Sequence, residues 1–287
     1  MPSIRLLKAF LLSFAICISA AANGRVETVR FQSKLINTTL PYNVILPTDY
    51  ETSKTTRYPV LYLLHGLTGH YSDWVARTNV ADYAAGYRMI VVTPEGNDSW
   101  YTDSTNGKYE SYILKELIPD VEQRYRTIEA RYGRSIAGLS MGGYGAIKFG
   151  LKSPATFIFA ASMSGAFVVP RLAEKETPES WLESLKPFGP IGSEIRRAND
   201  LFEILEKLTP ARVTALPYFY FDCGTEDLPL IFPSNRELAA LMFEKKIPHE
   251  FRQLPGDHSW AYWDRQVQEI LKIAADKMRL PKRTSRA

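Results

Sequence analysis

The chain has 287 residues, enough for one large α/β domain or for two small ones. Hydrophobic residues make up 45% of it and charged residues 23%, an ordinary balance for a soluble globular protein with a sizeable core. Its net charge of +4 is small, which argues against a nucleic-acid partner, because such a partner needs a clustered basic surface.

The first 22 residues have the pattern of a secretory signal peptide. Arg5 and Lys8 provide a charged start, and residues 9–19 form an apolar run that is too short to span a bilayer. Three consecutive alanines then offer the small side chains that a signal peptidase requires. We therefore expect a secreted or periplasmic mature chain of residues 23–287, without stable membrane insertion.

Strand and helix patterns alternate along the rest of the chain. Strands are expected at 28–35, 40–46, 59–64, 89–93, 134–139, 157–162, 216–223 and 250–254. Helices are expected at 110–125, 142–152, 193–208, 235–245 and 261–278. The first two strands alternate polar and apolar residues and fit an antiparallel pair at one edge. The whole pattern predicts a single α/β domain, with a mostly parallel central sheet of about eight strands and helices on both faces.

Ser140 stands in Gly138-Leu139-Ser140-Met141-Gly142, between a buried strand and a helix. A serine at such a sharp turn is lifted clear of the sheet, and the flanking glycines tolerate the crowding. The Met141 N–H then lies at a helix N-terminus, where it suits a developing oxyanion. The pattern predicts Ser140 as a nucleophile and Met141 as an oxyanion donor; the alternative is a structural glycine-rich turn.

Residues 165–210 interrupt the alternation, because they contain no strand pattern and their prolines break any long helix. We expect a cap-like insertion over the carboxyl edge of the sheet, where open α/β sheets place their substrate pockets. The alternative is a connecting helix with long loops.

An acid is expected after the strand at 216–223, to orient a histidine that activates the serine. Asp227 is the first choice, because it lies beyond the tight turn at Gly224 and its side chain can bend back toward the site. Glu226 is the rival, and either residue can instead be a solvated loop charge.

A serine hydroxyl needs a neighbouring base at neutral pH. His258 lies in the loop between the last strand and the last helix, where this kind of sheet places its base. His65 and His70 precede the serine, and His249 stands at the entrance of the last strand, where a structural role is expected. His258 is therefore the predicted base, with a plain loop histidine as the alternative.

The loop after the strand at 59–64 reads His65-Gly66-Leu67-Thr68-Gly69. In sheets with a nucleophile turn, this loop supplies a second N–H to the oxyanion. We choose the Leu67 N–H, because Gly66 lets the backbone turn toward Ser140. His65 is expected to hold the loop rather than to act as a base.

With these residues placed, the chain resembles the esterase D-like family of α/β-hydrolases, which includes tributyrin esterases, S-formylglutathione hydrolases, feruloyl and acetylxylan esterases and mycolyltransferases. The matching motifs are Leu63–Leu67 with Asp73-Trp74, Pro94–Gly96 with Trp100–Asp103, Gly138–Ala146, Cys223–Asp227 and Gly256–Trp260. The stretches 100–103 and 138–146 look closest to tributyrin esterases. The resemblance implies the α/β-hydrolase fold, with Ser140 as nucleophile, Asp227 as acid, His258 as base, and Leu67 and Met141 as oxyanion donors.

The resemblance also implies an activity, namely hydrolysis of short-chain acyl or acyl-sugar esters through an acyl-serine intermediate. The alternatives are an acyltransferase of the mycolyltransferase type, a feruloyl or acetylxylan esterase, and a non-catalytic binding protein. Relatives often carry an aromatic residue after the acid, where this chain has Leu228, so the pocket is expected to differ. Export argues against a glutathione thioester as the substrate.

Three aromatic residues, Trp100, Tyr101 and Trp260, lie in loops near the expected site and are predicted to line the substrate pocket. Cys223 is expected to be a buried strand-end residue and not a reactive thiol, because no basic neighbour would lower its pKa. The histidines lack zinc-ligand spacing and no acidic cluster resembles a calcium loop, so neither a metal nor another cofactor is expected.

Overall fold

A computed structural model describes residues 24–278 except 174, 176 and 178. The expected signal peptide at 1–22 lies outside the described residues. Within them, no helix combines the length and the apolar character needed to cross a membrane.

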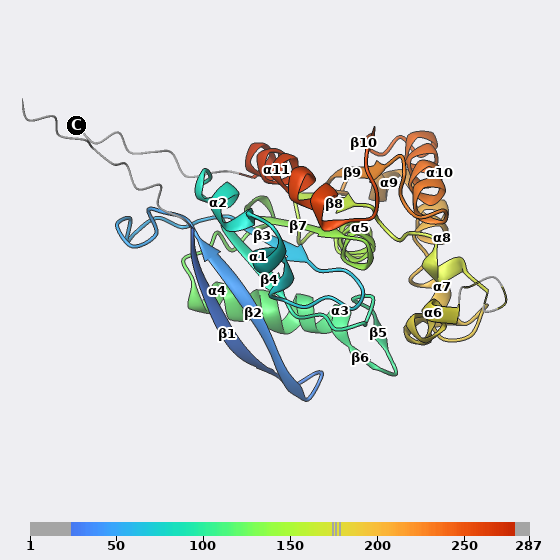
Figure 1. Cartoon of the computed structure of the whole chain (residues 1–287), viewed down its shortest axis with the longest axis horizontal. Coiled ribbons are helices and arrows are strands. Elements are labelled where there is room, and N and C mark those ends of the chain that lie inside the picture. Colours follow the sequence, from blue (N-terminus) through green and yellow to red (C-terminus); the bar gives the residue numbers. More distant parts are fainter. Residues whose placement is uncertain (1–23, 174, 176, 178, 279–287) are drawn as a thin grey trace, which may run out of the picture.

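An eight-stranded sheet runs through the middle of the molecule in the order β1-β2-β4-β3-β7-β8-β9-β10 (Figure 1). Its strands are β1 Arg25–Ser33, β2 Thr38–Leu46, β3 Val60–Leu64, β4 Ile90–Pro94, β7 Arg134–Leu139, β8 Phe159–Met163, β9 Tyr218–Gly224 and β10 His249–Leu254. β2 pairs antiparallel with β1 and with β4, and the other neighbours in the sheet are parallel. The predicted mostly parallel sheet, with an antiparallel pair at one edge, is confirmed.

The strands in the middle of the sheet are buried on both faces, which explains their continuous apolar sequences. Val60, Tyr62 and Leu64 of β3 belong to one core cluster. Leu61 and Leu63, which point to the other face, belong to a second cluster. The two clusters are therefore the two faces of the sheet, each covered by its own helices.

The first face, which carries Val60, Tyr62 and Leu64, is covered by most of the helices. They are the continuous run α3 Tyr109–Tyr112, η1 Ile113–Leu117 and α4 Ile118–Arg124, then α5 Met141–Lys152, α8 Leu201–Glu206 and α10 Ile231–Glu244. The second face is covered by α1 Asp73–Arg77, α2 Val80–Ala85 and α11 Trp260–Lys277. On α11 Val267, Ile270, Leu271 and Ala274 form an apolar stripe at helical spacing, and all four are fully buried. The sequence patterns do not predict α1, α2 or the small ribbon of β5 Asp103–Ser104 and β6 Gly107–Lys108.

Between β8 and β9, the described residues form short helices and no strand, as the sequence predicts for 165–210. The elements are η3 Val169–Arg171, α6 Glu179–Leu182, η5 Glu183–Phe188, α7 Glu194–Arg197, α8 and, just beyond, α9 Pro210–Val213. The single helix expected at 193–208 is wrong, because α7 ends at Arg197 and a new N-cap at Asp200 begins α8. Ser193 Oγ accepts the Arg196 N–H, and Asp200 Oδ1 accepts the N–H of Phe202. Figure 1 shows α6 and α7 beyond the β10 end of the sheet, beside α8.

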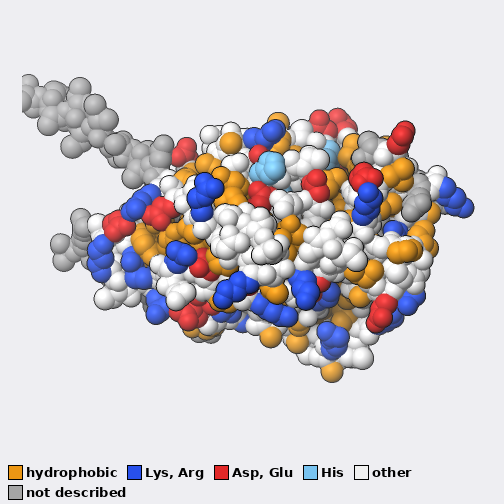
Figure 2. All heavy atoms as spheres, turned by 90° about the horizontal axis from the view of Figure 1, so that it is seen from below, with side chains coloured by type: hydrophobic (Ala, Val, Ile, Leu, Met, Phe, Trp, Pro, Cys, Tyr) orange, Lys and Arg blue, Asp and Glu red, His pale blue; other side chains and the backbone are white. Residues whose placement is uncertain are grey.

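The surface carries both signs of charge. Figure 2 shows one face of the molecule, on which basic, acidic and hydrophobic side chains are interspersed. Such mixing fits a small net charge of +4 and a site that depends on shape rather than on a strong surface field.

Candidate active site

Ser140 lies between the end of β7 and the start of α5, with φ 51° and ψ −114°. A non-glycine residue with positive φ costs on the order of 1–3 kcal/mol, so the surroundings must impose it. A Cβ on Gly138 would lie 2.4 Å from the Gly142 carbonyl carbon, and one on Gly142 would lie 2.5 Å from the His65 carbonyl oxygen. The two glycines allow this packing, and the Ser140 N–H donates to the Met163 carbonyl at 2.9 Å.

Ser140, His258 and Asp227 are brought together from three separate loops. His258 Nε2 lies 3.1 Å from Ser140 Oγ, and His258 Nδ1 lies 2.7 Å from Asp227 Oδ1. The Asp227 side chain is fully buried, whereas Glu226 is exposed on the same turn. Of the two acids weighed in the sequence, Asp227 is therefore the one that reaches the histidine.

The surroundings of Asp227 keep it ionised. Burial alone would raise its pKa, but the hydrogen bond and charge of His258, with bonds from Ser164 and the Leu228 N–H, lower the pKa below its usual value. Asp222, in β9, shows the opposite balance: burial raises its pKa to about 7. Its Oδ1 accepts the Tyr262 hydroxyl at 2.7 Å, so this second acid is held by the core and not by the histidine.

The loop after β3 places a second N–H beside the serine turn. The Gly69 N–H donates to the Gly66 carbonyl at 3.1 Å, and the Thr68 N–H donates to Asp98 Oδ1 at 2.6 Å. Met141 is the first residue of α5, so its N–H has no partner within the helix. Leu67 and Met141 are thus both free to donate toward an oxyanion, since neither N–H has an acceptor within the described part of the chain.

Glu95, the residue after β4, supports this loop through its contacts with His65 and with backbone N–H groups. In the buried His65 ring, Nε2 accepts the Gly96 N–H at 2.9 Å and lies 3.2 Å from Glu95 Oε1, and Nδ1 lies 2.7 Å from the Gly66 carbonyl oxygen. Glu95 Oε1 also accepts the Asn97 N–H at 3.0 Å. Burial acts to raise the Glu95 pKa, but His65 and the backbone N–H groups lower it to about 2. His65 therefore holds the loop, as the sequence predicts.

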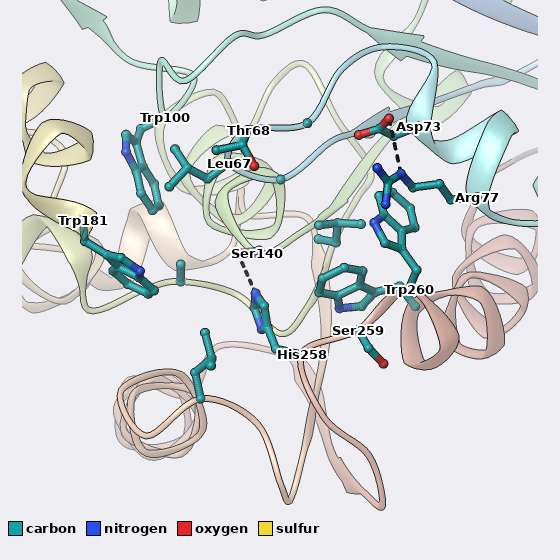
Figure 3. A pocket seen from close by; sticks show the side chains of 16 residues that line it. Leu67, Thr68, Asp73, Arg77, Trp100, Ser140, Trp181, His258, Ser259 and Trp260 are labelled. Atoms are coloured by element: carbon teal, nitrogen blue, oxygen red, sulfur yellow. Dashed lines mark hydrogen bonds and ion pairs between the residues drawn. The ribbon is translucent and has the colours of Figure 1, made fainter. Parts of the chain in front are cut away.

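A pocket of about 640 Å³ opens beside Ser140 and His258. Figure 3 shows Leu67, Trp100 and Trp181 on one side of Ser140, and Asp73, Arg77 and Trp260 on the other. We call these sides the aromatic arm and the polar arm. Ala166 and Leu228 also line the pocket.

The polar arm is built on α1 and on the start of α11. Arg77 Nε lies 3.6 Å from Asp73 Oδ1, and its guanidinium lies 5.6 Å from the centre of the Trp260 ring. The Trp260 ring packs edge-on against Trp74 and Trp263. The Arg77 side chain is 57% exposed and lines the pocket, so its guanidinium is accessible to a bound molecule.

The family model described as "Putative esterase" matches residues 33–273, nearly the whole described chain. The chain belongs to this esterase family. An acetyl esterase of Caldicellulosiruptor saccharolyticus is 26% identical over 84% of this chain and 95% of its own length. An esterase of Mycobacterium tuberculosis is 31% identical over 82% of this chain, which spans 56% of that longer protein.

Solved structures agree with the α/β-hydrolase fold. A ferulic acid esterase superposes with a TM-score of 0.79 at 28% identity, covering 89% of this chain and 98% of the other. A fluorophosphonate-binding serine hydrolase of Staphylococcus aureus superposes with a TM-score of 0.77 at 27% identity, covering 88% and 99%. The predicted esterase D-like resemblance and the α/β-hydrolase fold are both confirmed.

One predicted pocket residue of the esterase does not reach the pocket. Tyr101 is fully buried and is not among the lining residues, because its ring packs against Gly96 and Gly145 and its hydroxyl donates to the His65 carbonyl at 3.1 Å. The expectation of a substrate contact at Tyr101 is therefore wrong. Trp100 and Trp260 line the pocket, as the sequence predicts.

Asp73, Arg77 and Trp181 are among the pocket residues that the sequence does not predict. Asp73 and Arg77 lie on α1, whose five residues are too few for a clear helical period. Trp181 comes from the insertion over the site, and the only signal for it was the expected position of that insertion.

The esterase shows no grouping for a metal and no reactive thiol in the part of the chain that the structure describes. No three His, Cys, Asp or Glu side chains there are arranged to hold an ion. Cys223 is buried at the end of β9, with Sγ 3.6 Å from Asp227 Oδ2, and burial raises the pKa of its thiol. It is a packing residue beneath the acid.

Proposed function

We propose that this member of the esterase family is a serine carboxylesterase that hydrolyses short-chain esters through an acyl-serine intermediate at Ser140. The observation that carries the proposal is the continuous hydrogen-bonded chain from Ser140 Oγ to His258 and from His258 to Asp227, at 3.1 and 2.7 Å. A binding protein would have no use for all three groups in this order.

The first half of the reaction forms the acyl-serine. His258 Nε2 takes the Ser140 proton while Oγ attacks the ester carbonyl carbon, and the Leu67 and Met141 N–H groups stabilise the oxyanion. Such donors are worth about 3 kcal/mol each in the transition state. His258 then gives its proton to the alcohol oxygen as the C–O bond breaks.

The second half releases the acid. His258 takes a proton from a water molecule, the hydroxide attacks the acyl carbon, and the proton returns to Ser140 Oγ as the acyl bond breaks. Asp227 stays ionised throughout and stabilises the imidazolium, in keeping with its lowered pKa.

The two arms of the pocket favour different ends of the substrate. Apolar surface in the aromatic arm, from Leu67, Trp100 and Trp181, suits a short acyl chain. Arg77 and Trp260 in the polar arm suit an alcohol that carries hydroxyl groups, including a sugar. The name of the acetyl esterase relative fits a small acyl group at this site, and that of the ferulic acid esterase fits an aromatic acyl group against the indole rings.

The experiment compares the wild-type chain with Ser140→Ala on nitrophenyl esters of increasing acyl length. We expect wild-type hydrolysis that is greatest for short acyl groups and a loss of about 10⁶-fold in kcat for Ser140→Ala. A fluorophosphonate probe should add to Ser140 in the wild type, as located by peptide mass spectrometry. Hydrolysis retained in a folded Ser140→Ala protein, or no adduct at Ser140, would contradict the proposal, and the second outcome would favour a binding protein.

A second candidate, acyl transfer to an acceptor alcohol, is favoured by the polar arm, which lies beside His258 where an alcohol could take the place of water. Product analysis with an added sugar or glycerol tests it. Ester exchange would support a transferase, and free acid alone would support the esterase.

We also propose that the esterase is exported, because the first 22 residues have the features of a cleavable signal. Sequencing the N-terminus of the protein recovered from the periplasm or the medium should give a start at residue 23. Recovery of the full-length chain from the cytoplasm alone would contradict export.

A further inference from the structure

Lys148 is a buried charge for which the proposed reaction has no role. It lies on α5, two turns after Ser140, and its side chain is fully shielded from solvent. Burying an ammonium is costly unless hydrogen bonds and an opposite charge replace the lost water. The groups that replace water around Lys148 therefore show what this residue does.

The ammonium of Lys148 binds one short segment of the loop after β4. Nζ lies 2.7 Å from the Tyr101 carbonyl oxygen, 2.6 Å from Thr102 Oγ1 and 3.4 Å from the Trp100 carbonyl oxygen. Glu110 supplies the opposite charge, with Oε2 at 3.3 Å. The donors of the ammonium are thus directed at three consecutive residues of one turn.

That turn has an unfavourable backbone. Trp100 and Tyr101 have φ values of 54° and 49°, so two consecutive large aromatic residues lie in the left-handed region without a glycine. Buried carbonyl oxygens need donors. Lys148 supplies the side-chain donor to the Tyr101 carbonyl, and the Trp100 carbonyl accepts both the Thr102 hydroxyl at 3.0 Å and Lys148 Nζ at 3.4 Å. Lys148 and its partner Thr102 together therefore stabilise this backbone conformation.

Each residue of the turn contacts a different part of the site. The Trp100 ring forms the wall of the aromatic arm and packs against Tyr144 and Phe188, each with a ring-centre distance of 5.6 Å. The Tyr101 hydroxyl donates to the carbonyl of His65, two residues before Leu67. The turn therefore links the acyl wall to the loop that carries the oxyanion donor.

We propose that Lys148 is a positioning residue with two effects. Through Trp100 it sets acyl-chain selectivity, and through Tyr101 it sets the position of the loop after β3 that carries Leu67, here called the oxyanion loop. This proposal rests on the esterase function proposed above. The charges agree with this geometry. Burial lowers the Lys148 pKa to about 8, and the Glu110 carboxylate limits that lowering, so the ammonium is the main form at neutral pH.

Lys148→Met tests the proposal, since it keeps an unbranched apolar stem and removes the donors. Lys152→Met is the matched control, because Lys152 lies one turn later on α5 and binds the same carboxylate, Glu110, at 2.8 Å without touching the turn. Both are assayed on nitrophenyl acetate, butyrate and octanoate, with kcat and KM separated. Circular dichroism and thermal melting verify that each variant folds.

We expect Lys148→Met to lose about ten- to a hundred-fold in kcat and to change the octanoate-to-acetate ratio of kcat/KM by about five-fold or more. Lys152→Met should stay within about two-fold of wild type in both quantities. A folded Lys148→Met protein that matches Lys152→Met would overturn the inference. The function proposed for Ser140 would then still stand, because wild-type hydrolysis and its loss in Ser140→Ala are measured independently.

Two further variants separate the two routes and keep the test decisive if Lys148→Met does not fold. Thr102→Val removes one acceptor of the ammonium and the hydroxyl that donates to the Trp100 carbonyl, and it should change the chain-length ratio in the same direction by about two- to three-fold. Tyr101→Phe removes the bond to His65 and should lower kcat by about ten-fold with the ratio unchanged. An unchanged ratio in Thr102→Val, together with unchanged kcat in Tyr101→Phe, would refute both routes.

Discussion

Two regions border the pocket, and they are held in place by different means. At the ends of the sheet strands, Ser140 lies in a turn where neighbouring backbone leaves no room for a methyl group on Gly138 or Gly142. In the insertion at 165–210, Trp181 comes from a four-residue helix and reaches the pocket with a half-buried ring. The first region is fixed by backbone contact and by the charged pair of His258 and Asp227. The second is held to itself by packing and by the buried Arg196 guanidinium, which donates to the Gly189 and Leu172 carbonyls at 2.7 Å each. In the proposed mechanism the reacting groups therefore depend on the sheet, and we expect changes in the insertion to alter substrate preference and to leave the reaction steps unchanged.

The largest expected effect lies in the sheet region. Asp227→Asn should keep the fold but lower kcat by about 10⁴-fold, because the amide cannot stabilise the imidazolium and favours the wrong histidine tautomer. Glu226→Gln, on the same turn, should stay within about two-fold of wild type, since Glu226 is exposed. Steady-state kinetics on a short-chain ester measures both. Similar losses in the two variants would remove Asp227 from the proposed site.

A smaller but still severe effect is expected from one methyl group at the crowded turn. In Gly142→Ala, the new Cβ would lie 2.5 Å from the His65 carbonyl oxygen and 2.6 Å from that of Leu64, both of them backbone atoms. Since the oxyanion loop must shift, we expect a loss of about a hundred-fold in kcat. Overpacking should also reduce the free energy of unfolding by about 1–3 kcal/mol, measured by urea denaturation. Activity within two-fold of wild type would show that the loop tolerates displacement.

Glu95→Gln tests the brace behind the oxyanion loop. We expect about a ten-fold loss in kcat with little change in KM, because the loop loses its charged partner. The folded pKa of Glu95, about 2, lies below its ordinary value of 4.5, so its contribution to stability is complete above pH 4.5 and is lost as the pH falls toward 2. Thermal melting between pH 5 and pH 2 should therefore show a shallower acid decline in Glu95→Gln than in wild type. Parallel declines would contradict the lowered pKa.

The smallest effect is expected in the insertion. Trp181→Ala should raise KM for a long acyl ester by about five- to ten-fold and leave kcat on acetate unchanged, because it removes wall area and no group of the proposed mechanism. Trp181→Phe keeps an aromatic wall, so its KM for the long acyl ester should lie between those of the wild type and Trp181→Ala. A loss of kcat on acetate in Trp181→Ala would contradict the claim that the insertion affects substrate preference and not the reaction at Ser140.

The sequence predicts the parts of this molecule whose physical causes are local. Continuous apolar runs identify the central strands, because strands covered on both faces need no polar residues. The positions of Ser140, Asp227 and His258 follow from strand ends, since the carboxyl ends of parallel strands meet at one edge of the sheet. The Asp227 side chain lies beyond a tight turn, and this position was enough to prefer Asp227 to Glu226 from the sequence.

The parts that the sequence did not predict depend on contacts between distant segments. Tyr101 and Trp100 are neighbours, yet one faces the core and the other the pocket, because a left-handed turn held by Lys148 decides their directions. The N-cap at Asp200 divides a run for which hydrophobic spacing alone predicts one helix. Arg77 enters the pocket only because the short helix α1 packs beside the start of α11.

All five tryptophans of the chain are gathered at the site: four line the pocket, and the fifth, Trp74, packs edge-on against Trp260. The His258 ring itself lies edge-on against Trp263, with their centres 5.0 Å apart. The indole fluorescence of the protein consequently originates almost entirely at the pocket and not from a scattered background. We therefore expect the emission spectrum to report on occupancy of the pocket, so that formation of the proposed acyl-serine can be tested by stopped-flow fluorescence with no added label.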